Sequence, residues 1–260
     1  MKKLYVALAM SFGVMAGVSA NAQAEETLKI GVEAMYPPFE SKDANGKLVG
    51  FDIELADAVC AKLQAKCEWV ESSFDGLIPA LNARKFDFIN SNMHITEQRL
   101  KAINFTAPIY DVPSQLIVAK DVDLSDISAE SLKVKNIAVG VLQGSSQERY
   151  AKKHWQANGV KVVSYPNQDQ VYADLENNRI QGAFQNSASS LFEQKAGANF
   201  KHIAQFAEDP EVLGVGIGFG VRKKDTELKE RLDKAIDELK KEGFIKELSM
   251  KYFQADWTAK

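Results

Sequence analysis

The sequence predicts an α/β protein made of two similar units, each with a mainly parallel sheet covered by helices. Two observations support this. Runs suited to buried strands alternate with runs of helical apolar spacing. In addition, the strand–turn–helix pattern "FDFINSNMHITEQR" has a later counterpart in "NIAVGVLQGSSQERY". Strands that alternate with helices are typical of parallel sheets, because neighbouring parallel strands need a crossover connection.

The first residues are typical of a secretory signal peptide. A basic start, "MKK", is followed by the apolar run "LYVALAMSFGVMAGV", and Ala22-Gln23-Ala24 is a small-x-small cleavage site. We therefore expect residues 1–24 to be removed and the mature chain to begin at Glu25. The apolar run is too short for a stable membrane span, and no cysteine marks a lipid anchor. The mature protein is expected to be soluble and exported.

The first α/β unit follows directly. Residues 27–32 are expected to form a buried strand, and Asn45-Gly46 indicates a tight turn between short strands. Apolar spacing predicts a helix over 51–67, then a strand at 67–72. A short amphipathic helix over 74–85 and a strand at 86–91 complete the β-α-β-α-β order.

The second unit starts after an extended, proline-containing segment, 103–120. It is expected to contain three strand–turn–helix repeats, a further strand and two final helices broken at Gly243. The corresponding ranges are 136–155, 160–179 and 180–194 for the repeats, 215–223 for the strand and 225–253 for the helices.

Composition and cysteine content narrow the function. The chain is 45% hydrophobic and 26% charged, has a net charge of −3 and contains no basic run, which disfavours nucleic acid as a partner. Its only cysteines, Cys60 and Cys67, predict a disulfide in an exported protein. The spacing is wide for a metal site and no histidine is near, so we predict no metal and no cofactor.

The polar turns that follow the strands are the candidate binding site. In open parallel sheets, ligands bind beyond the carboxyl ends of the strands. The turns at these ends are rich in amides and hydroxyls, and two of them start helices, whose free N–H groups suit an anion. They lie at 33–39, 90–99, 143–147 and 185–187.

Arg99 is the candidate carboxylate ligand in the second of these turns. Thr96 is a plausible helix N-cap, and side chains lean toward a helix N-terminus, so Arg99 can reach back into the turn. A guanidinium forked onto a carboxylate makes two charge-assisted hydrogen bonds. The alternative is a surface arginine that pairs with Glu97.

Several motifs resemble the periplasmic amino-acid-binding proteins of ABC importers, solute-binding family 3, and most closely the lysine/arginine/ornithine, histidine and arginine receptors. The motifs are "IGVEAMYPPFE", "GFDIELADAVC", "FDGLIPALNARKFD", "ITEQR", "VGVLQGSSQE" and "GVGIGFGVRKKD". The resemblance implies a periplasmic-binding-protein-like fold, with two α/β lobes joined by a two-strand hinge and a ligand cleft between them. The implied boundaries are 25–110 and 213–260 for lobe 1 and 111–212 for lobe 2, with hinge strands near 110–114 and 209–213.

The resemblance also assigns roles to residues of this chain. Arg99, Ser91 and Asn92 in lobe 1, and Ser145, Ser146 and Gln147 in lobe 2, match the groups that hold the ligand carboxylate. Tyr36 and Phe74 match aromatic residues around the ligand side chain, and Glu33 matches an acidic residue that receives a basic side chain. Cys60 and Cys67 match the family's paired cysteines.

Two positions depart from the family pattern. Asn186 stands where relatives have an aspartate that holds the α-ammonium group, and His94 stands where relatives usually have Ser, Thr or Asp. In "VLGVGIG" the chain also lacks the relatives' aromatic-glycine segment. These departures affect the identity of the ligand rather than the fold.

Other interpretations remain open at this point. Tyr36 and Phe74 are also suited to a hydrophobic core, Glu33 to a solvated strand end and His94 to a turn hydrogen bond. We predict a monomeric, non-catalytic receptor that delivers a polar, basic amino acid or a derivative to a membrane permease. A chemoreceptor as second partner would add to this role. The alternative is an exported cyclohexadienyl dehydratase-like enzyme with Glu33 as the acid and His94 as helper.

Overall fold

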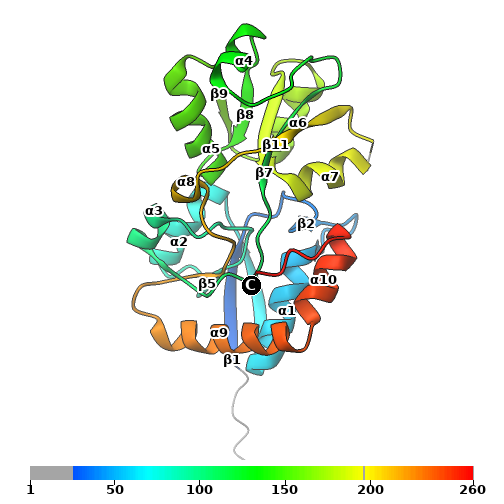
Figure 1. Ribbon diagram of the computed structural model, residues 1–260. Coiled ribbons are helices and arrows are strands. Elements are labelled where there is room, and N and C mark those ends of the chain that lie inside the picture. Colours follow the sequence, from blue (N-terminus) through cyan, green and yellow to red (C-terminus); the bar gives the residue numbers. More distant parts are fainter. Residues whose placement is uncertain (1–25, 196, 260) are drawn as a thin grey trace, which may run out of the picture.

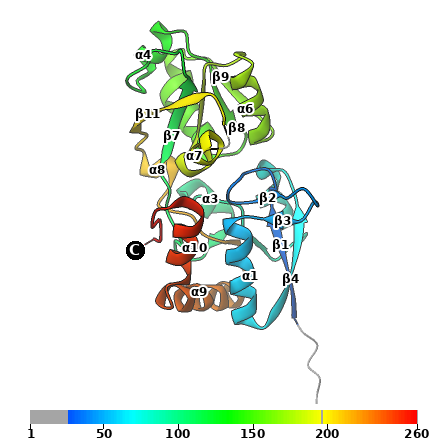
Figure 2. The same cartoon turned by 90° about the vertical axis from the view of Figure 1, so that its right-hand side faces the viewer.

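The computed structural model describes residues 26–195 and 197–259, so the predicted signal peptide lies outside the described residues. Two α/β lobes, each built on its own five-stranded sheet, lie one above the other (Figure 1). The predicted fold class is confirmed. Both chain crossings between the lobes run along one side of the molecule, as the turned view shows (Figure 2).

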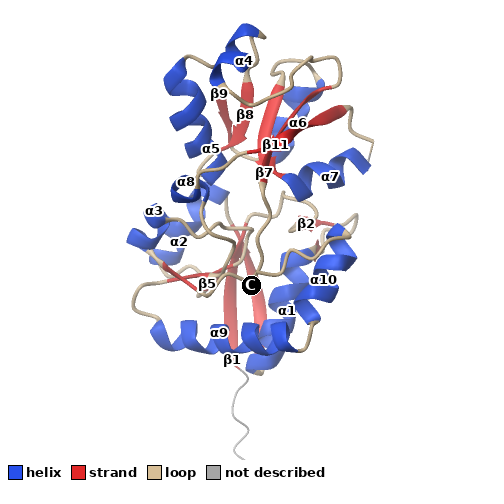
Figure 3. Ribbon diagram, in the orientation of Figure 1, coloured by secondary structure: helices blue, strands red, loops and turns tan. Residues whose placement is uncertain are grey.

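The lower lobe contains a sheet of order β4-β1-β5-β12-β6, in which β1 is parallel to β4 and β5 whereas β12 is antiparallel to β5 and β6. Its strands are β1 (Glu26–Val32), β4 (Ala65–Glu71), β5 (Phe88–Ile89), β6 (Asn104–Phe105) and β12 (Gly220–Val221). Helices cover both faces: α1 (Phe51–Leu63), α2 (Leu77–Asn82) after the 3-10 turn η1 (Phe74–Gly76), α3 (Glu97–Ala102), α9 (Thr226–Lys241) and α10 (Phe244–Phe253) (Figure 3). The hairpin β2 (Ser41–Lys42) and β3 (Leu48–Val49) turns at Gly46, whose φ of 79° explains the glycine.

The upper lobe contains a sheet of order β11-β7-β10-β8-β9. Strands β8 (Val139–Leu142), β9 (Val162–Tyr165) and β10 (Gly182–Asn186) are parallel, whereas β7 (Ser114–Ala119) runs antiparallel between β10 and β11 (Phe200–Phe206). The helices are α4 (Ala129–Val134), α5 (Ser146–Tyr150), continued by the π turn η2 (Ala151–Trp155) and the 3-10 turn η3 (Gln156–Asn158), α6 (Gln168–Glu176), α7 (Ser187–Lys195) and α8 (Pro210–Leu213). Strand β11 and helix α4 were not predicted. Burial along β11 does not alternate, so it lacks the usual periodic signal of a strand.

Two local predictions need correction. Residues 209–213, expected to be an extended hinge segment, contain helix α8 instead. The Asp209 carboxylate accepts from the Val212 N–H at 3.2 Å and Pro210 occupies the first turn, and both features favour a helix start. The strand expected over 215–223 is reduced to Gly220–Val221, and beside it Ile217 pairs with Tyr110.

Other local predictions are confirmed. Cys60 and Cys67 form a disulfide with their Cα atoms 6.2 Å apart, which ties the end of α1 to β4. Gly243, with a φ of 80°, separates α9 from α10. Within the described part of the chain, the helices are all too short or too polar to cross a membrane.

Candidate functional site

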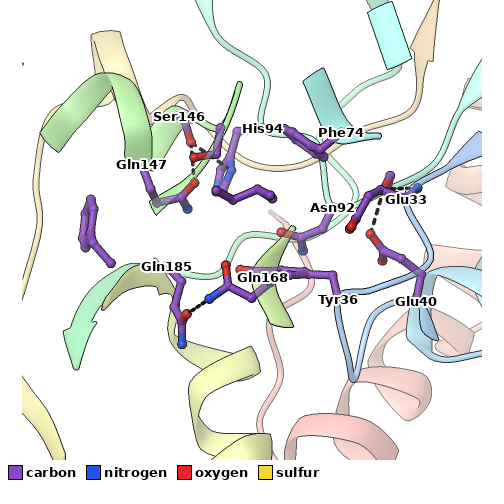
Figure 4. A pocket seen from close by; sticks show the side chains of 14 residues that line it. Glu33, Tyr36, Glu40, Phe74, Asn92, His94, Ser146, Gln147, Gln168 and Gln185 are labelled. Carbon is purple, nitrogen blue, oxygen red and sulfur yellow. Dashed lines mark hydrogen bonds between the residues drawn. The ribbon is translucent and has the colours of Figure 1, made fainter. Parts of the chain in front are cut away.

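A cavity lies between the two lobes, at the carboxyl ends of β1, β5, β8 and β10 (Figure 4). Both sheets direct these ends toward the interlobe region, so turns that are far apart in sequence meet there. The lining residues are Glu33, Tyr36, Glu40, Phe74, Ser91, Asn92, His94, Leu142, Ser145, Ser146, Gln147, Gln168, Phe184 and Gln185.

The structure brings most of the predicted site residues to this cavity: Glu33, Tyr36, Phe74, Ser91, Asn92, His94, Ser145, Ser146 and Gln147. Arg99 and Asn186 are buried beside it but do not line it. The sequence analysis did not select Glu40, Leu142, Gln168, Phe184 or Gln185. Gln185 lay in a turn that was singled out, and Gln168 begins a helix directly after β9, so the same strand–turn–helix signal was available for it.

Glu33 is an acidic group without a partner at one end of the cavity. Its side chain is only 3% exposed, and neither carboxyl oxygen accepts a hydrogen bond from any described residue. Burial, together with the nearby charge of Asp169, raises the pKa of Glu33 to about 7. A buried carboxylate without a partner is costly, so this end of the cavity favours a cation.

Glu40 and Asp52 form a second acidic group behind Glu33. Asp52 accepts from the Asn92 N–H at 2.7 Å and from the Tyr110 hydroxyl at 2.8 Å, and Glu40 accepts from the Ser91 hydroxyl at 2.8 Å. Burial and the charge of Asp52 raise the pKa of Glu40 well above its usual value. Burial also raises the pKa of Asp52, to about 6, so the two neighbouring carboxyl groups disfavour being ionised together.

Arg99 is the buried cation of the site. Its N–H is capped by the Thr96 hydroxyl at 3.3 Å, as predicted, and its guanidinium carbon lies 5.3 Å from the centre of the Phe74 ring. The guanidinium donates to the carbonyl oxygens of His94 at 2.8 Å and Gly144 at 3.1 Å, so it joins the two lobes. Burial, with the charge of Arg149, lowers its pKa to about 9. No carboxylate pairs with it in residues 26–195 and 197–259.

The turn before α5 lies next to Arg99. The Ser145 hydroxyl caps the helix by accepting from the Glu148 N–H at 2.9 Å. The Glu148 carboxylate in turn accepts from the Gly144 N–H at 2.8 Å, which holds the turn in place. The Ser146 and Gln147 side chains face the cavity from this turn, and Gln147 also donates to Ser114 at 2.9 Å.

His94 is a neutral hydrogen-bonding group. Its Nδ1 lies 3.2 Å from the Ser146 hydroxyl, and the ring also faces the Val112 carbonyl. Burial, with the charges of Arg99 and Arg149, lowers its pKa to about 3. At neutral pH the imidazole is therefore uncharged. The Ser146 hydroxyl also donates to Gln147 Oε1 at 3.2 Å, and the direction of its bond to His94 Nδ1 depends on the imidazole tautomer.

Asn186 uses its side chain within the protein. Its Oδ1 accepts from the Ala188 N–H at 2.9 Å, and its Nδ2 donates to Asn92 Oδ1 at 3.4 Å. The backbone N–H of Asn186 donates to the Tyr36 hydroxyl at 3.2 Å. Asn186 thus links the two lobes.

The lobes are closed on one another. Besides the contacts of Arg99, His94 and Asn186, Gln143 donates to Asp75 at 2.9 Å and Ser189 donates to the Pro37 carbonyl at 2.9 Å. Phe74 and Tyr36 lie on different sides of the enclosed space in Figure 4. Closure removes the cavity from water, so every charge on a ligand inside it requires a partner.

Comparisons with known proteins agree with this arrangement. Residues 28–255 match the family model of bacterial extracellular solute-binding proteins, family 3. The chain is 41% identical over 259 residues to the histidine-binding periplasmic protein of Escherichia coli K12, covering 98% of each chain. It is 42% identical over 256 residues to the lysine/arginine/ornithine-binding periplasmic protein of the same strain, covering 97% of each.

A solved structure shows the same fold. An ancestral arginine-binding protein bound to arginine matches with a TM-score of 0.80 and 38% identity, over 88% of this chain and 99% of that one. The family match spans both lobes, and the relatives are matched over almost their whole length. The chain is a member of family 3 of the bacterial extracellular solute-binding proteins.

Proposed function

We propose that this protein captures a basic amino acid in the periplasm and delivers it to the membrane permease of an ABC importer. The observation that carries the proposal is a pair of opposite charges, Glu33 lining the interlobe cavity and Arg99 buried beside it, neither of which has an oppositely charged partner among the described residues. Among the described residues, the Glu33 carboxylate has no hydrogen-bond partner, and the Arg99 guanidinium has no acidic partner. Both side chains are buried. A molecule with a carboxylate and a cationic side chain satisfies both.

In this proposal, Arg99 and the turn at Ser145–Gln147 hold the carboxylate, and Glu33 holds the cationic side chain. Phe74 and Tyr36 contact the aliphatic stem between them. The relatives named for histidine, arginine, and lysine/arginine/ornithine bind ligands with this combination of groups. Delivery to a permease follows from the family.

Isothermal titration calorimetry with arginine, lysine, ornithine and histidine tests the proposal, with glutamine as the neutral comparison. We expect at least one basic amino acid to bind far more tightly than glutamine. Equal or weaker binding of every basic amino acid would overturn it. The intact mass of periplasmic protein should also show loss of residues 1–24.

A second ligand class follows from Asn186. An N-substituted amino acid makes a smaller demand on an anionic partner at its α-nitrogen, because an acylated nitrogen is neutral and an opine carries a second carboxylate beside its ammonium; Asn186 offers no negative charge there. An opine panel in the same titrations tests this candidate. Tight opine binding together with weak binding of simple amino acids would favour it.

The enzyme alternative has little support in the site. The curated relatives reported above are named as binding proteins. No described residue is hydrogen-bonded to the Glu33 carboxylate, and Nδ1 of His94 bonds to Ser146 instead. Incubation with prephenate should yield no phenylpyruvate, and any enzymatic conversion would reverse the proposal of a non-catalytic receptor.

A further inference from the structure

Gln168 is a buried amide that lines the cavity from the start of α6. It is 1% exposed, and its Oε1 has no hydrogen-bond donor among the described residues. The helix is capped by Asn167, which accepts from the Gln170 N–H at 3.0 Å, so the position of Gln168 does not depend on a bound molecule. A buried amide oxygen without a partner costs free energy unless a ligand donates to it.

A chain of hydrogen bonds determines which end of this amide faces the cavity. Gln168 Nε2 donates to Gln185 Oε1, and Gln185 Nε2 donates to the Tyr172 hydroxyl at 2.7 Å. The Tyr172 hydroxyl lies 3.2 Å from the Ser189 hydroxyl, which donates to the Pro37 carbonyl at 2.9 Å. The carboxamides of Gln168 and Gln185 face each other in Figure 4.

The donor-to-acceptor direction of this series of hydrogen bonds follows from its last acceptor, the Pro37 carbonyl. The Pro37 carbonyl can only accept, so the single proton of Ser189 points to it. Ser189 must then accept from Tyr172, and Tyr172 must accept from Gln185. Gln185 therefore turns its oxygen toward Gln168. If the Gln168 amide were flipped, two oxygens would oppose each other.

The chain depends on lobe closure. Gln168, Gln185, Tyr172 and Ser189 belong to the upper lobe, whereas Pro37 follows β1 of the lower lobe. When the lobes separate, Ser189 loses its acceptor and the direction of the chain is no longer imposed. The orientation of the Gln168 oxygen is therefore set by the same movement that encloses the ligand.

We propose that Gln168 is a specificity-determining residue whose oxygen accepts a hydrogen bond from the cationic side chain of the ligand, in an orientation imposed by the chain that ends at Pro37. This inference rests on the proposed function. Glu33 lies at the same cavity, where neither of its oxygens has a partner in the described part of the chain, and Asp169 follows Gln168 along the helix. Acceptors from both lobes suit a group with N–H donors on several edges, so a guanidinium is favoured.

Arginine and citrulline are the probes, because citrulline replaces the charged guanidinium by a neutral urea whose oxygen would face these acceptors. We expect wild type to prefer arginine strongly. Gln168→Leu should weaken arginine binding by about ten- to hundredfold and citrulline binding much less. Ser189→Ala, which leaves Gln168 in place but removes the end of the chain, should reduce the arginine preference by a smaller factor.

Gln143→Leu is the matched control. It too removes a glutamine carboxamide from the upper lobe, but Gln143 bonds to Asp75 of the lower lobe and does not line the cavity. It should change arginine and citrulline affinity equally. Thermal unfolding of each variant checks that it folds.

The outcomes separate the two proposals. If wild type binds arginine tightly and Gln168→Leu keeps the wild-type arginine-to-citrulline ratio, the role of Gln168 is overturned and the proposed function stands. If wild type binds no basic amino acid, both fall. A ratio that drops only in Gln168→Leu and Ser189→Ala supports the proposal.

Discussion

The two buried charged residues at the interlobe cavity, Arg99 and Glu33, differ in how many hydrogen bonds the protein gives them. Arg99 is buried but donates to two backbone carbonyls, so its guanidinium is held in place and stays charged. Glu33 is equally buried, but its carboxylate has no hydrogen-bond partner within residues 26–195 and 197–259, and its pKa rises to about 7. The cationic end is thus prepared by the main chain, whereas the acidic end is completed only by what binds to it.

Replacement of Arg99 should reduce ligand affinity more than any other substitution considered. Arg99→Ala is expected to weaken binding of any carboxylate ligand by ~3–5 kcal/mol, about two to four decades, because one partner of a buried charge pair is lost. Calorimetry measures the loss, and circular dichroism checks the fold. Arg99→Lys should also bind poorly, since an ammonium cannot reproduce the fork. A loss below about threefold for Arg99→Ala would show that Arg99 is not the carboxylate ligand.

Neutralising the acidic end should have a smaller but selective effect. Glu33→Gln is expected to weaken basic ligands by ~1.5–3 kcal/mol, because a charged acceptor becomes a neutral one. Binding of glutamine should change little, so the ratio of the two affinities is the measurement. Equal losses for basic and neutral ligands would indicate that Glu33 supports the fold of the site rather than its charge preference.

The raised pKa of Glu33 predicts a pH dependence. A cationic ligand binds the ionised carboxylate, so below pH 7 binding must first remove a proton and affinity falls by up to about tenfold per pH unit. His94, with a pKa of about 3, and Arg99, with a pKa of about 9, keep their charge states between pH 6 and 8. The Glu40–Asp52 pair also titrates and can add a smaller change, because burial raises the pKa of Asp52 to about 6.

Titrations at pH 6, 7 and 8 measure this effect, and buffers of different ionisation enthalpy report the released proton. Glu33→Gln is the control and should flatten most of the profile. If Glu33→Gln shows the same pH profile as wild type, the proton released on binding comes from another group. Asp169 and the Glu40–Asp52 pair would then be the next acids to test.

The smallest expected change in ligand affinity comes from a substitution at Asn186. Asn186→Asp keeps an oxygen for the Ala188 N–H and adds a charge, so a ligand with a primary α-ammonium beside it should bind tighter by ~1 kcal/mol or more. A ligand with a neutral, acylated nitrogen should bind more weakly instead. Affinities of wild type and variant for arginine, lysine, histidine and an opine panel distinguish the two. Nanomolar binding of free arginine or lysine by wild type would contradict the idea that Asn186 shifts the preference from simple amino acids to N-substituted ones.

Local sequence signals located most of the candidate site. The N-cap at Thr96, the turn before Ser145 and the strand ends at Glu33 and Asn186 all follow from hydrophobic periodicity and capping chemistry within a few residues. The carboxyl-end rule for parallel sheets then predicts that these turns meet. Strand β11 and helix α8 were missed because their short patterns carry weak periodic signals.

The sequence by itself therefore determined the α/β fold, the disulfide and most of the turns that line the interlobe cavity. Only the tertiary structure decided which polar atoms are free to bind it. The Asn186 amide is hydrogen-bonded to Ala188 and Asn92. The Arg99 guanidinium donates to the Gly144 carbonyl. The orientation of the Gln168 amide depends on the Pro37 carbonyl, which lies in the other lobe. Hydrogen bonds of this kind join residues far apart in the chain, and burial, which shifts the pKa of Glu33, exists only after both lobes have closed.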